Sequence, residues 1–266
     1  MDISFDKLAP EYDTARGLLP NEAAEKITNT IEMLASAGPH TRFLEPGIGT
    51  GRVALPLLRR GYAYTGIDIS VPMMEELRRK VQPASQKLSL IQADITALPF
   101  KDSSFDIVLT AQVLYLVPDW RRALAEMRRV LNPGGLYLYS YEETEQDPLA
   151  ALIDRQWFAL LAQHGYLAEW QSSVSNREIL STIQEQHGLI QTVIAADWEH
   201  RIVVRDYLER YATILRGLYS HVPDHAFSGL MHQLRAWTSA QVDTDSEVIS
   251  TYTKFMIAAV SSWSAN

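Results

Sequence analysis

The fold is decided by one stretch of sequence, Phe43-Leu44-Glu45-Pro46-Gly47-Ile48-Gly49-Thr50-Gly51-Arg52. A short apolar run ends at an acidic residue, three glycines follow at alternate positions, and a helical pattern begins after them. The stretch therefore predicts a strand, a tight turn and a helix. Glycines adopt positive φ and let a backbone approach a ligand closely, while the helix directs free N–H groups at the turn. We interpret this unit as the binding site of a nucleotide-like ligand.

Strand and helix patterns alternate on both sides of the turn, which is typical of a parallel, doubly wound α/β sheet. The stretch Asn132-Pro133-Gly134-Gly135 is expected to break the chain sharply between a helix and the next strand. The strands up to this point are expected at 41–45, 62–68, 87–94, 105–111 and 136–141. The helices are expected from residue 21 to about 38, from the turn to about 61, at 71–81 and at 118–131.

The rest of the chain is less regular. A helix is expected at 149–164, a strand at 189–198, and a last strand at 250–261. Two helical stretches lie between these last two strands, in an insertion of roughly forty residues that is longer than an ordinary connection. We expect this insertion, residues 204–241, to act as a lid or a packing element.

Composition narrows the class of partner. The 266 residues include 24 Lys and Arg against 32 Asp and Glu, with a net charge of −8 and a pI near 5.4. The chain therefore lacks the excess of basic residues that would indicate nucleic acid as a partner. We interpret the local basic pairs as solvated helix surface. These pairs are Arg59-Arg60, Arg78-Arg79-Lys80, Arg121-Arg122 and Arg128-Arg129.

Other classes of chemistry and location are disfavoured. The chain has no cysteine, which excludes disulfides, thiolate nucleophiles and Cys-bound metals. No metal-site geometry can be argued for the histidines, so no metal is expected. No apolar run approaches the roughly 20 residues of a membrane span, and the acidic N-terminus lacks an apolar signal core. We therefore expect a cytoplasmic protein without a membrane partner.

Three acidic residues sit at the ends of consecutive predicted strands. Glu45 precedes the glycine turn, Asp68 ends the second strand, and Asp94 ends the third. The third glycine comes one residue earlier than in the dinucleotide fingerprint G-x-G-x-x-G. A lone acidic residue at a strand end is usually a helix cap or a solvated loop residue. Here, acidic residues end three consecutive predicted strands, and one of them precedes a glycine turn. This arrangement favours a nucleoside site, because carboxylates there can accept hydrogen bonds from ribose hydroxyls and an adenine amino group.

These pieces together resemble the class I S-adenosylmethionine-dependent methyltransferases of the small-molecule type, related to the ubiquinone/menaquinone methyltransferases. The resemblance covers residues 5–142 in the family's order and stops there. The matching motifs are Phe5-Asp-Lys-Leu-Ala-Pro-Glu-Tyr12-Asp13, Leu44-Glu-Pro-Gly-Ile-Gly-Thr-Gly51, Gly66-Ile-Asp-Ile-Ser70, Ala93-Asp-Ile-Thr-Ala-Leu-Pro-Phe100, Phe105-Asp-Ile-Val-Leu-Thr-Ala111 and Arg129-Val-Leu-Asn-Pro-Gly-Gly135. The resemblance implies a Rossmann-like sheet of seven strands with the last strand antiparallel and S-adenosylmethionine as cofactor.

The resemblance also implies roles at the methionine and ribose end of the cofactor. Gly47 and Gly49 would underlie the methionine and the ribose, with Glu45 near the methionine amino group. Asp68 would bind the ribose hydroxyls.

At the adenine, the resemblance places Ile69 against the ring, Asp94 at the amino group and Ile95 at the ring edge. Ala111 would offer its carbonyl to the methionine amine. Tyr12 and Arg16 resemble a segment that folds over the methionine end.

The implied reaction is an in-line attack of a substrate nucleophile on the sulfonium methyl group, and no catalytic residue is assigned. Open α/β sheets bind ligands beyond the carboxyl ends of their strands. With Tyr12, that selects as acceptor-side candidates Gln112, Tyr115, Tyr141, Glu142, Trp198 and His200.

We expect a single methyltransferase domain over 1–266, with an N-terminal helical segment at 1–38 and the cofactor-binding core at 41–142. Two alternatives stay open, a dinucleotide-dependent (NAD-type) oxidoreductase and a non-catalytic S-adenosylmethionine-binding protein. The acceptor, the atom methylated, the use of a general base and the oligomeric state are not assigned.

Overall fold

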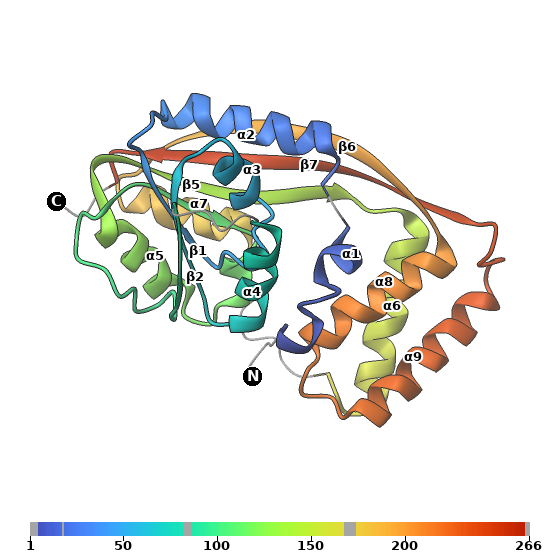
Figure 1. Ribbon diagram of the computed structural model, residues 1–266. Coiled ribbons are helices and arrows are strands. Elements are labelled where there is room, and N and C mark those ends of the chain that lie inside the picture. Colours follow the sequence, from blue (N-terminus) through green and yellow to red (C-terminus); the bar gives the residue numbers. More distant parts are fainter. Residues whose placement is uncertain (1–4, 18, 82–86, 168–173, 264–266) are drawn as a thin grey trace. The chain divides into compact units, whose positions relative to one another are not determined.

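The structure is a computed structural model, and it describes residues 5–17, 19–81, 87–167 and 174–263. Seven strands form one sheet in the order β3-β2-β1-β4-β5-β7-β6 (Figure 1). The strands are β1 (Arg42–Pro46), β2 (Ala63–Asp68), β3 (Leu88–Gln92), β4 (Phe105–Ala111), β5 (Leu131–Glu145), β6 (Leu189–Val203) and β7 (Val248–Ser261). The α-helices are α1 (Tyr12–Arg16), α2 (Asn21–Ala35), α3 (Ala54–Arg59), α4 (Val71–Lys80), α5 (Trp120–Val130), α6 (Pro148–Gln163), α7 (Asn176–Glu185), α8 (Val204–Leu218) and α9 (Asp224–Ser239).

The strand register confirms the predicted doubly wound sheet. β1 pairs in parallel with both β2 and β4, β2 with β3, and β4 with β5, whereas β7 is antiparallel. The carboxyl ends of β1, β2, β3 and β4 therefore meet at one edge of the sheet. This edge is where open α/β sheets bind their ligands.

The chain forms two compact units, and three of the five divisions between them fall inside the long strands β5, β6 and β7. The sheet unit comprises the described parts of 19–143, 171–197 and 254–266, and the helical unit those of 1–18, 144–170 and 198–253. The helical unit has an apolar core from α6, α8 and α9, in which Trp157 contacts Tyr219 and Phe227 edge-on. The predicted insertion 204–241 corresponds to α8 and α9.

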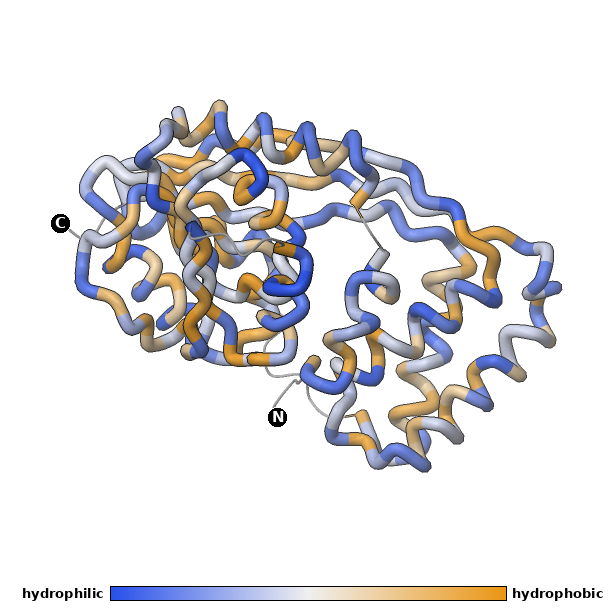
Figure 2. Tube along the Cα trace, in the orientation of Figure 1, coloured by the Kyte–Doolittle hydropathy of each residue, from blue (hydrophilic) through white to orange (hydrophobic). Residues whose placement is uncertain are grey.

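Amphipathic helices cover the sheet unit. One sheet face carries Leu44, Val108 and Tyr137 and packs against α5 and α7. Strand side chains alternate between faces, so Phe43 and Glu45 project to the other face. Helix α2 is one of these amphipathic helices. Its apolar residues Ile27 and Ile31 are buried, while its sequence mixes polar and apolar residues (Figure 2).

The structure corrects three sequence-based expectations. Residues 132–135 lie inside β5, where the register shifts so that Phe105 pairs with Leu131 but Ile107 pairs with Leu136. The preceding helix ends at Val130, close to where it was expected to end, but the strand begins at Leu131, so the proline and glycines form an irregularity inside β5. Helix α7 was not expected, although Ser175 and Glu178 form a complete capping box at its start.

The third correction concerns strand lengths. β5 and β6 extend several residues past their expected ends at 141 and 198. Tyr141, Glu142, Trp198 and His200 therefore lie within strands and do not follow them.

Within the described ranges, no helix has both the length and the apolar character needed to cross a membrane.

Candidate cofactor site

The glycine turn has a backbone that only glycine fits. Gly47, Gly49 and Gly51 have φ of 75°, 52° and 79°. A Cβ on Gly47 would lie 2.4 Å from Val113 Cγ2, and one on Gly51 would lie 2.3 Å from Leu77 Cδ1. The turn is therefore pressed against the chain that follows β4 and against α4, with no space for side chains at these positions.

Glu45 is fully buried at the start of the turn. Its side chain is only 2% exposed, and its Oε2 accepts a hydrogen bond of 2.5 Å from the Tyr64 hydroxyl. Burial raises the pKa of Glu45 to about 8, although the Tyr64 hydrogen bond opposes this rise, and the charge of Asp68 adds to it. A carboxyl with this pKa is mostly protonated at neutral pH.

Asp68 ties the end of β2 to the glycine turn. Its Oδ2 accepts the Gly49 N–H at 2.8 Å, and its Oδ1 accepts the Ser70 N–H at 2.9 Å. The N–H groups of Gly47 and Ile48 both donate to the Ile67 carbonyl, at 2.8 and 3.0 Å. The carboxylate predicted to bind ribose is thus held in one orientation beside the turn.

The residues predicted to contact adenine follow at the ends of β2 and β3. The side chain of Ile69 is 70% exposed, an unusual exposure for isoleucine next to a fixed carboxylate. Asp94 is exposed, and its Oδ1 accepts hydrogen bonds from both the N–H and the hydroxyl of Thr96, each at 2.8 Å. Ile95, by contrast, is buried in the core of the sheet unit. The Ala93 N–H donates to the Asp68 carbonyl at 3.2 Å and so joins the two strand ends.

β4 is followed directly by a strained residue. Ala111 pairs with Ser140 of β5, and the next residue, Gln112, has φ of 56°. The Gln112 amide nitrogen Nε2 is buried and has no hydrogen-bond partner among the described residues. Strained backbone and an unsatisfied buried polar atom cost stability, and both cluster at functional sites.

Tyrosines gather near the carboxyl ends of β4 and β5. Tyr139 and Tyr141 stack with ring centroids 5.3 Å apart, and the Tyr139 hydroxyl donates to Asn176 Oδ1 at 2.5 Å. Burial raises the pKa of Tyr139, and the phenols of Tyr141 and Tyr115 raise it further. Burial is also the main cause of a raised pKa at Tyr141. The phenols of Tyr139 and Tyr141 therefore stay protonated near neutral pH. Sequence reasoning missed Tyr139, which the period-two spacing from Tyr141 would have placed on the same face.

Glu142 makes an ion pair with Arg52, which directly follows the glycine turn, at 3.2 Å. This contact joins the turn to β5 within the sheet unit. The structure thus brings together the turn, Asp68, the Asp94 segment, Ala111 and Gln112.

Four other predicted residues belong to the helical unit. Tyr12 lies in α1 together with Arg16, and its ring packs edge-on against Phe5, which precedes that helix. Trp198 is half-buried and His200 exposed, both within β6. The His200 ring nitrogen Nε2 lies 3.1 Å from Arg210, and burial together with this cation lowers the pKa of His200. A shared pocket of these four residues with those of the sheet unit stays a prediction.

Comparisons with known proteins fit this arrangement. Residues 44–139 match a family described as a methyltransferase domain. A demethylmenaquinone methyltransferase of Thermus thermophilus is 36% identical over 49% of this chain and 60% of its own length. A fatty-acid O-methyltransferase of Mycolicibacterium smegmatis is 28% identical over 81% of this chain and 77% of its own length. Against the first of these relatives, the match spans less than two thirds of the relative's length.

Solved structures agree on the fold. The [4+2]-cyclase SpnF superposes with a TM-score of 0.60 over 98% of this chain and 94% of its own, at 16% identity. That likeness concerns the fold alone. Residues 44–139 therefore match a methyltransferase domain, and they lie in a seven-stranded mixed sheet of the Rossmann-like type found in class I methyltransferases.

Proposed function

We propose that this protein transfers the methyl group of S-adenosylmethionine to a small-molecule acceptor. The observation that carries the proposal is the methyltransferase-domain match over residues 44–139, which includes the glycine turn, Asp68 and Asp94. These residues lie at the ends of adjacent parallel strands, where ligands of open α/β sheets bind.

The sheet unit fits the cofactor. The side-chain-free turn at Gly47 and Gly49 offers a backbone cradle for the methionine and ribose. Asp68 would accept hydrogen bonds from the ribose hydroxyls. The exposed Ile69 would cover one face of the adenine, and Asp94 would accept a hydrogen bond from the adenine amino group. Buried Ile95 would contribute its backbone at the ring edge.

The methionine end has two candidates. The Ala111 carbonyl would accept a hydrogen bond from the methionine amine. Glu45 would approach the same amine only after losing its proton, because an ammonium group attracts the carboxylate form. Cofactor binding is therefore coupled to a proton at Glu45.

When bound, the cofactor supplies a methyl carbon made electrophilic by positively charged sulfur. The residues of this chain need only align the acceptor and exclude water, and alignment alone contributes up to ~7–11 kcal/mol in well-oriented reactions. Gln112, Tyr115 and Tyr141 are the sheet-unit side chains we assign to the acceptor side. The partnerless Nε2 of Gln112 would donate to an acceptor oxygen.

A dinucleotide-dependent oxidoreductase fits less well. The dinucleotide fingerprint places its third glycine one residue later than Gly51. It also does not require an acidic residue at the position of Asp94. Thermal shift measurements separate the two, because S-adenosylhomocysteine should raise the melting temperature and NAD should leave it unchanged.

A non-catalytic cofactor-binding protein is the second alternative. The fold alone does not decide between these functions, since a cyclase shares it. The strained Gln112 with its unsatisfied amide favours catalysis, because a protein that only binds cofactor gains nothing from that strain.

A screen with isotopically labelled methyl donor tests the proposal. The protein, the labelled donor and a panel of small metabolites are incubated, and the labelled product is identified by mass spectrometry. The two relatives described above are named for different acceptors, so the panel should include quinones and fatty acids. Binding of S-adenosylhomocysteine without transfer to any compound, in the panel or in a cell extract, would favour the non-catalytic alternative.

A further inference from the structure

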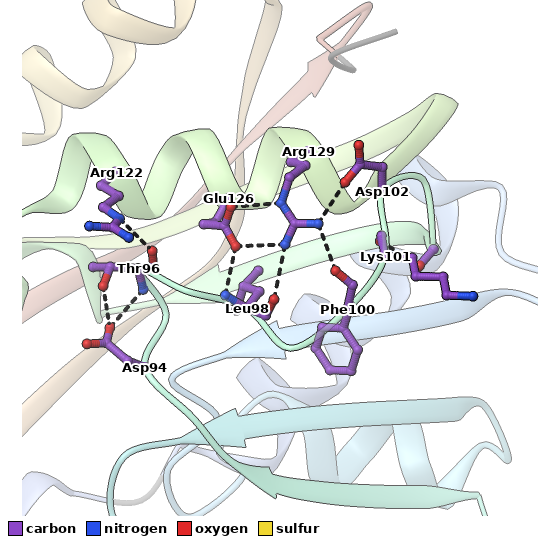
Figure 3. Close-up of polar contacts among 10 residues, drawn as sticks. Asp94, Thr96, Leu98, Phe100, Lys101, Asp102, Arg122, Glu126 and Arg129 are labelled. Atoms are coloured by element: carbon purple, nitrogen blue, oxygen red, sulfur yellow. Dashed lines mark hydrogen bonds and ion pairs between the residues drawn. The ribbon is translucent and has the colours of Figure 1, made fainter.

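The β3–β4 loop, residues 93–104, carries Asp94 and has little regular structure of its own. Its conformation is fixed by one helix, α5, whose polar side chains bind its backbone. Figure 3 shows Arg122, Glu126 and Arg129 of α5 directed at this loop. Each lies three or four residues from the next, so all three share one helix face.

Arg129 uses every donor that it has. Its Nε and Nη2 donate to the Glu126 carboxylate, each at 2.7 Å, and Nη2 also donates to the Leu98 carbonyl at 3.0 Å. Its Nη1 donates to the Phe100 carbonyl at 2.7 Å and to Asp102 Oδ1 at 2.8 Å. A guanidinium has five N–H groups, and all five are thus engaged.

Glu126 and Arg122 complete the arrangement. Glu126 Oε2 accepts the Leu98 N–H at 2.7 Å, and the Arg122 Nε donates to the Thr96 carbonyl at 3.0 Å. Thr96 in turn donates twice to Asp94. The carbonyls bound by the arginines belong to residues 96, 98 and 100, in a segment made mainly of turns and bends.

The charges support the geometry. The Arg129 guanidinium holds the pKa of Glu126 below its usual value, with burial opposing and the Leu98 N–H assisting. Arg129 and Glu126 are largely shielded from solvent, with side-chain exposures of 27% and 19%. This corrects the interpretation of Arg128-Arg129 as solvated surface, since Arg128 also donates to the Trp263 carbonyl at 2.9 Å.

We propose that Arg129, Glu126 and Arg122 are positioning residues that set the recognition of the adenine amino group by holding the loop that presents Asp94. The inference rests on the proposed function, in which Asp94 accepts that amino group. None of the three touches the cofactor in this scheme. They act through Thr96 and Leu98, whose backbone they bind.

The test measures amino-group recognition and not only stability. Isothermal titration calorimetry gives the Kd of S-adenosylhomocysteine and of its purine analogue that lacks the 6-amino group. We expect the wild type to prefer the first by about tenfold, the cost of leaving a carboxylate without its donor. Asp94→Ala and Arg129→Met should each reduce this ratio to near 1. Arg129→Lys, which keeps the charge but has three donors, should give an intermediate ratio.

Two further variants sharpen the result. Arg121→Met is the matched control, because Arg121 lies on the same helix over the Trp120 ring and does not bind the loop. It should keep the wild-type ratio. The double variant Asp94→Ala/Arg129→Met should show no further loss of selectivity beyond either single variant, as expected when one residue acts through the other.

Each outcome has one meaning. If Arg129→Met melts at a lower temperature yet keeps the wild-type ratio, the arginine is merely structural and the inference is wrong. If Arg129→Met does not fold, the variant Arg122→Met takes its place, because Arg122 is exposed. An unchanged ratio of the two Kd values in Arg122→Met would then overturn the inference. A wild type that binds both ligands alike also overturns it but leaves the proposed function standing. A wild type that binds neither removes the proposed function itself.

Discussion

The Tyr64 hydroxyl donates a 2.5 Å hydrogen bond to the carboxyl of Glu45, and both side chains are almost completely buried. The ring of Tyr64 also stacks on Phe43, with centroids 5.5 Å apart and planes 8° from parallel. The acidic residue of the glycine turn is therefore held by the neighbouring strand β2.

Replacing Glu45 by glutamine should flatten the pH dependence of stability. The folded-state pKa of Glu45, about 8, lies above its ordinary value of 4.5, so the folded protein retains a proton that the unfolded chain releases. The stability contributed by this group is fully present below about pH 4.5 and is lost as the pH rises to about 8. Between pH 5 and 7 the wild type should lose on the order of 1 kcal/mol per pH unit relative to Glu45→Gln. Urea unfolding at several pH values measures this difference in slope, and parallel slopes would contradict it.

Removing the Tyr64 hydroxyl should destabilise the fold. Tyr64→Phe keeps the stacking on Phe43 but leaves a buried carboxyl without its donor, which costs about 1–3 kcal/mol. Tyr62→Phe is the matched control, because Tyr62 contacts the same Phe43 ring edge-on but is only partly buried. Urea unfolding compares the two variants. Equal losses would show that the Glu45 contact contributes nothing specific.

Gly47→Ala should lose stability in two separable parts. The positive φ costs an alanine about 1–2 kcal/mol, and the contact with Val113 adds to this cost. Gly134→Ala is the control for the first part, because Gly134 has φ of 76° and open space around its Cα. The double variant Gly47→Ala/Val113→Ala should remove the contact with Val113 Cγ2, but it should keep the contact with the Cβ atom at 2.8 Å and the backbone strain. Unfolding free energies of the four proteins test this division, and a Gly47→Ala loss no larger than that of Gly134→Ala would refute the clash.

Gln112→Gly should separate stability from activity. Glycine accepts the φ of 56° without steric cost, so the variant should be at least as stable as the wild type, by up to ~1 kcal/mol. If Gln112 orients the acceptor, kcat/KM for methyl transfer should fall at least ~10-fold. Thermal unfolding and steady-state kinetics are the two measurements. A variant that loses stability, or one that keeps full activity, would argue against a functional role for this strain.

Local patterns in the sequence predict much of the sheet unit. The apolar runs of β1, β2 and β4 and the glycine turn between Glu45 and Gly51 depend on neighbouring residues only, and the structure agrees closely there. Helix α7 has an equally local signal in Ser175 and Glu178, which was overlooked.

The remaining features depend on contacts between distant residues. The sequence alone suggests that Arg129 is a surface residue, because its own helix gives no sign of the loop carbonyls that it binds. Those carbonyls lie some thirty positions earlier in the chain. Glu45 and Tyr64 are 19 residues apart and meet only through strand pairing. The strain at Gln112 is also invisible, because glutamine is not a residue that prefers positive φ.

The engagement of Arg129 and Arg122 with alternate carbonyls constrains the length of the chain between β3 and β4. Residues 95–100 consist mainly of turns and bends, in which the Ala97 N–H donates to the Asp94 carbonyl and the Phe100 N–H to the Leu98 carbonyl. A single-residue insertion at 97–99 would disturb these turns and displace the Leu98 or Phe100 carbonyl from the Arg129 guanidinium. Substitutions are tolerated wherever only backbone is bound, so the segment can vary in side chains but not in residue count. Related proteins that keep the two arginines should accordingly keep this spacing.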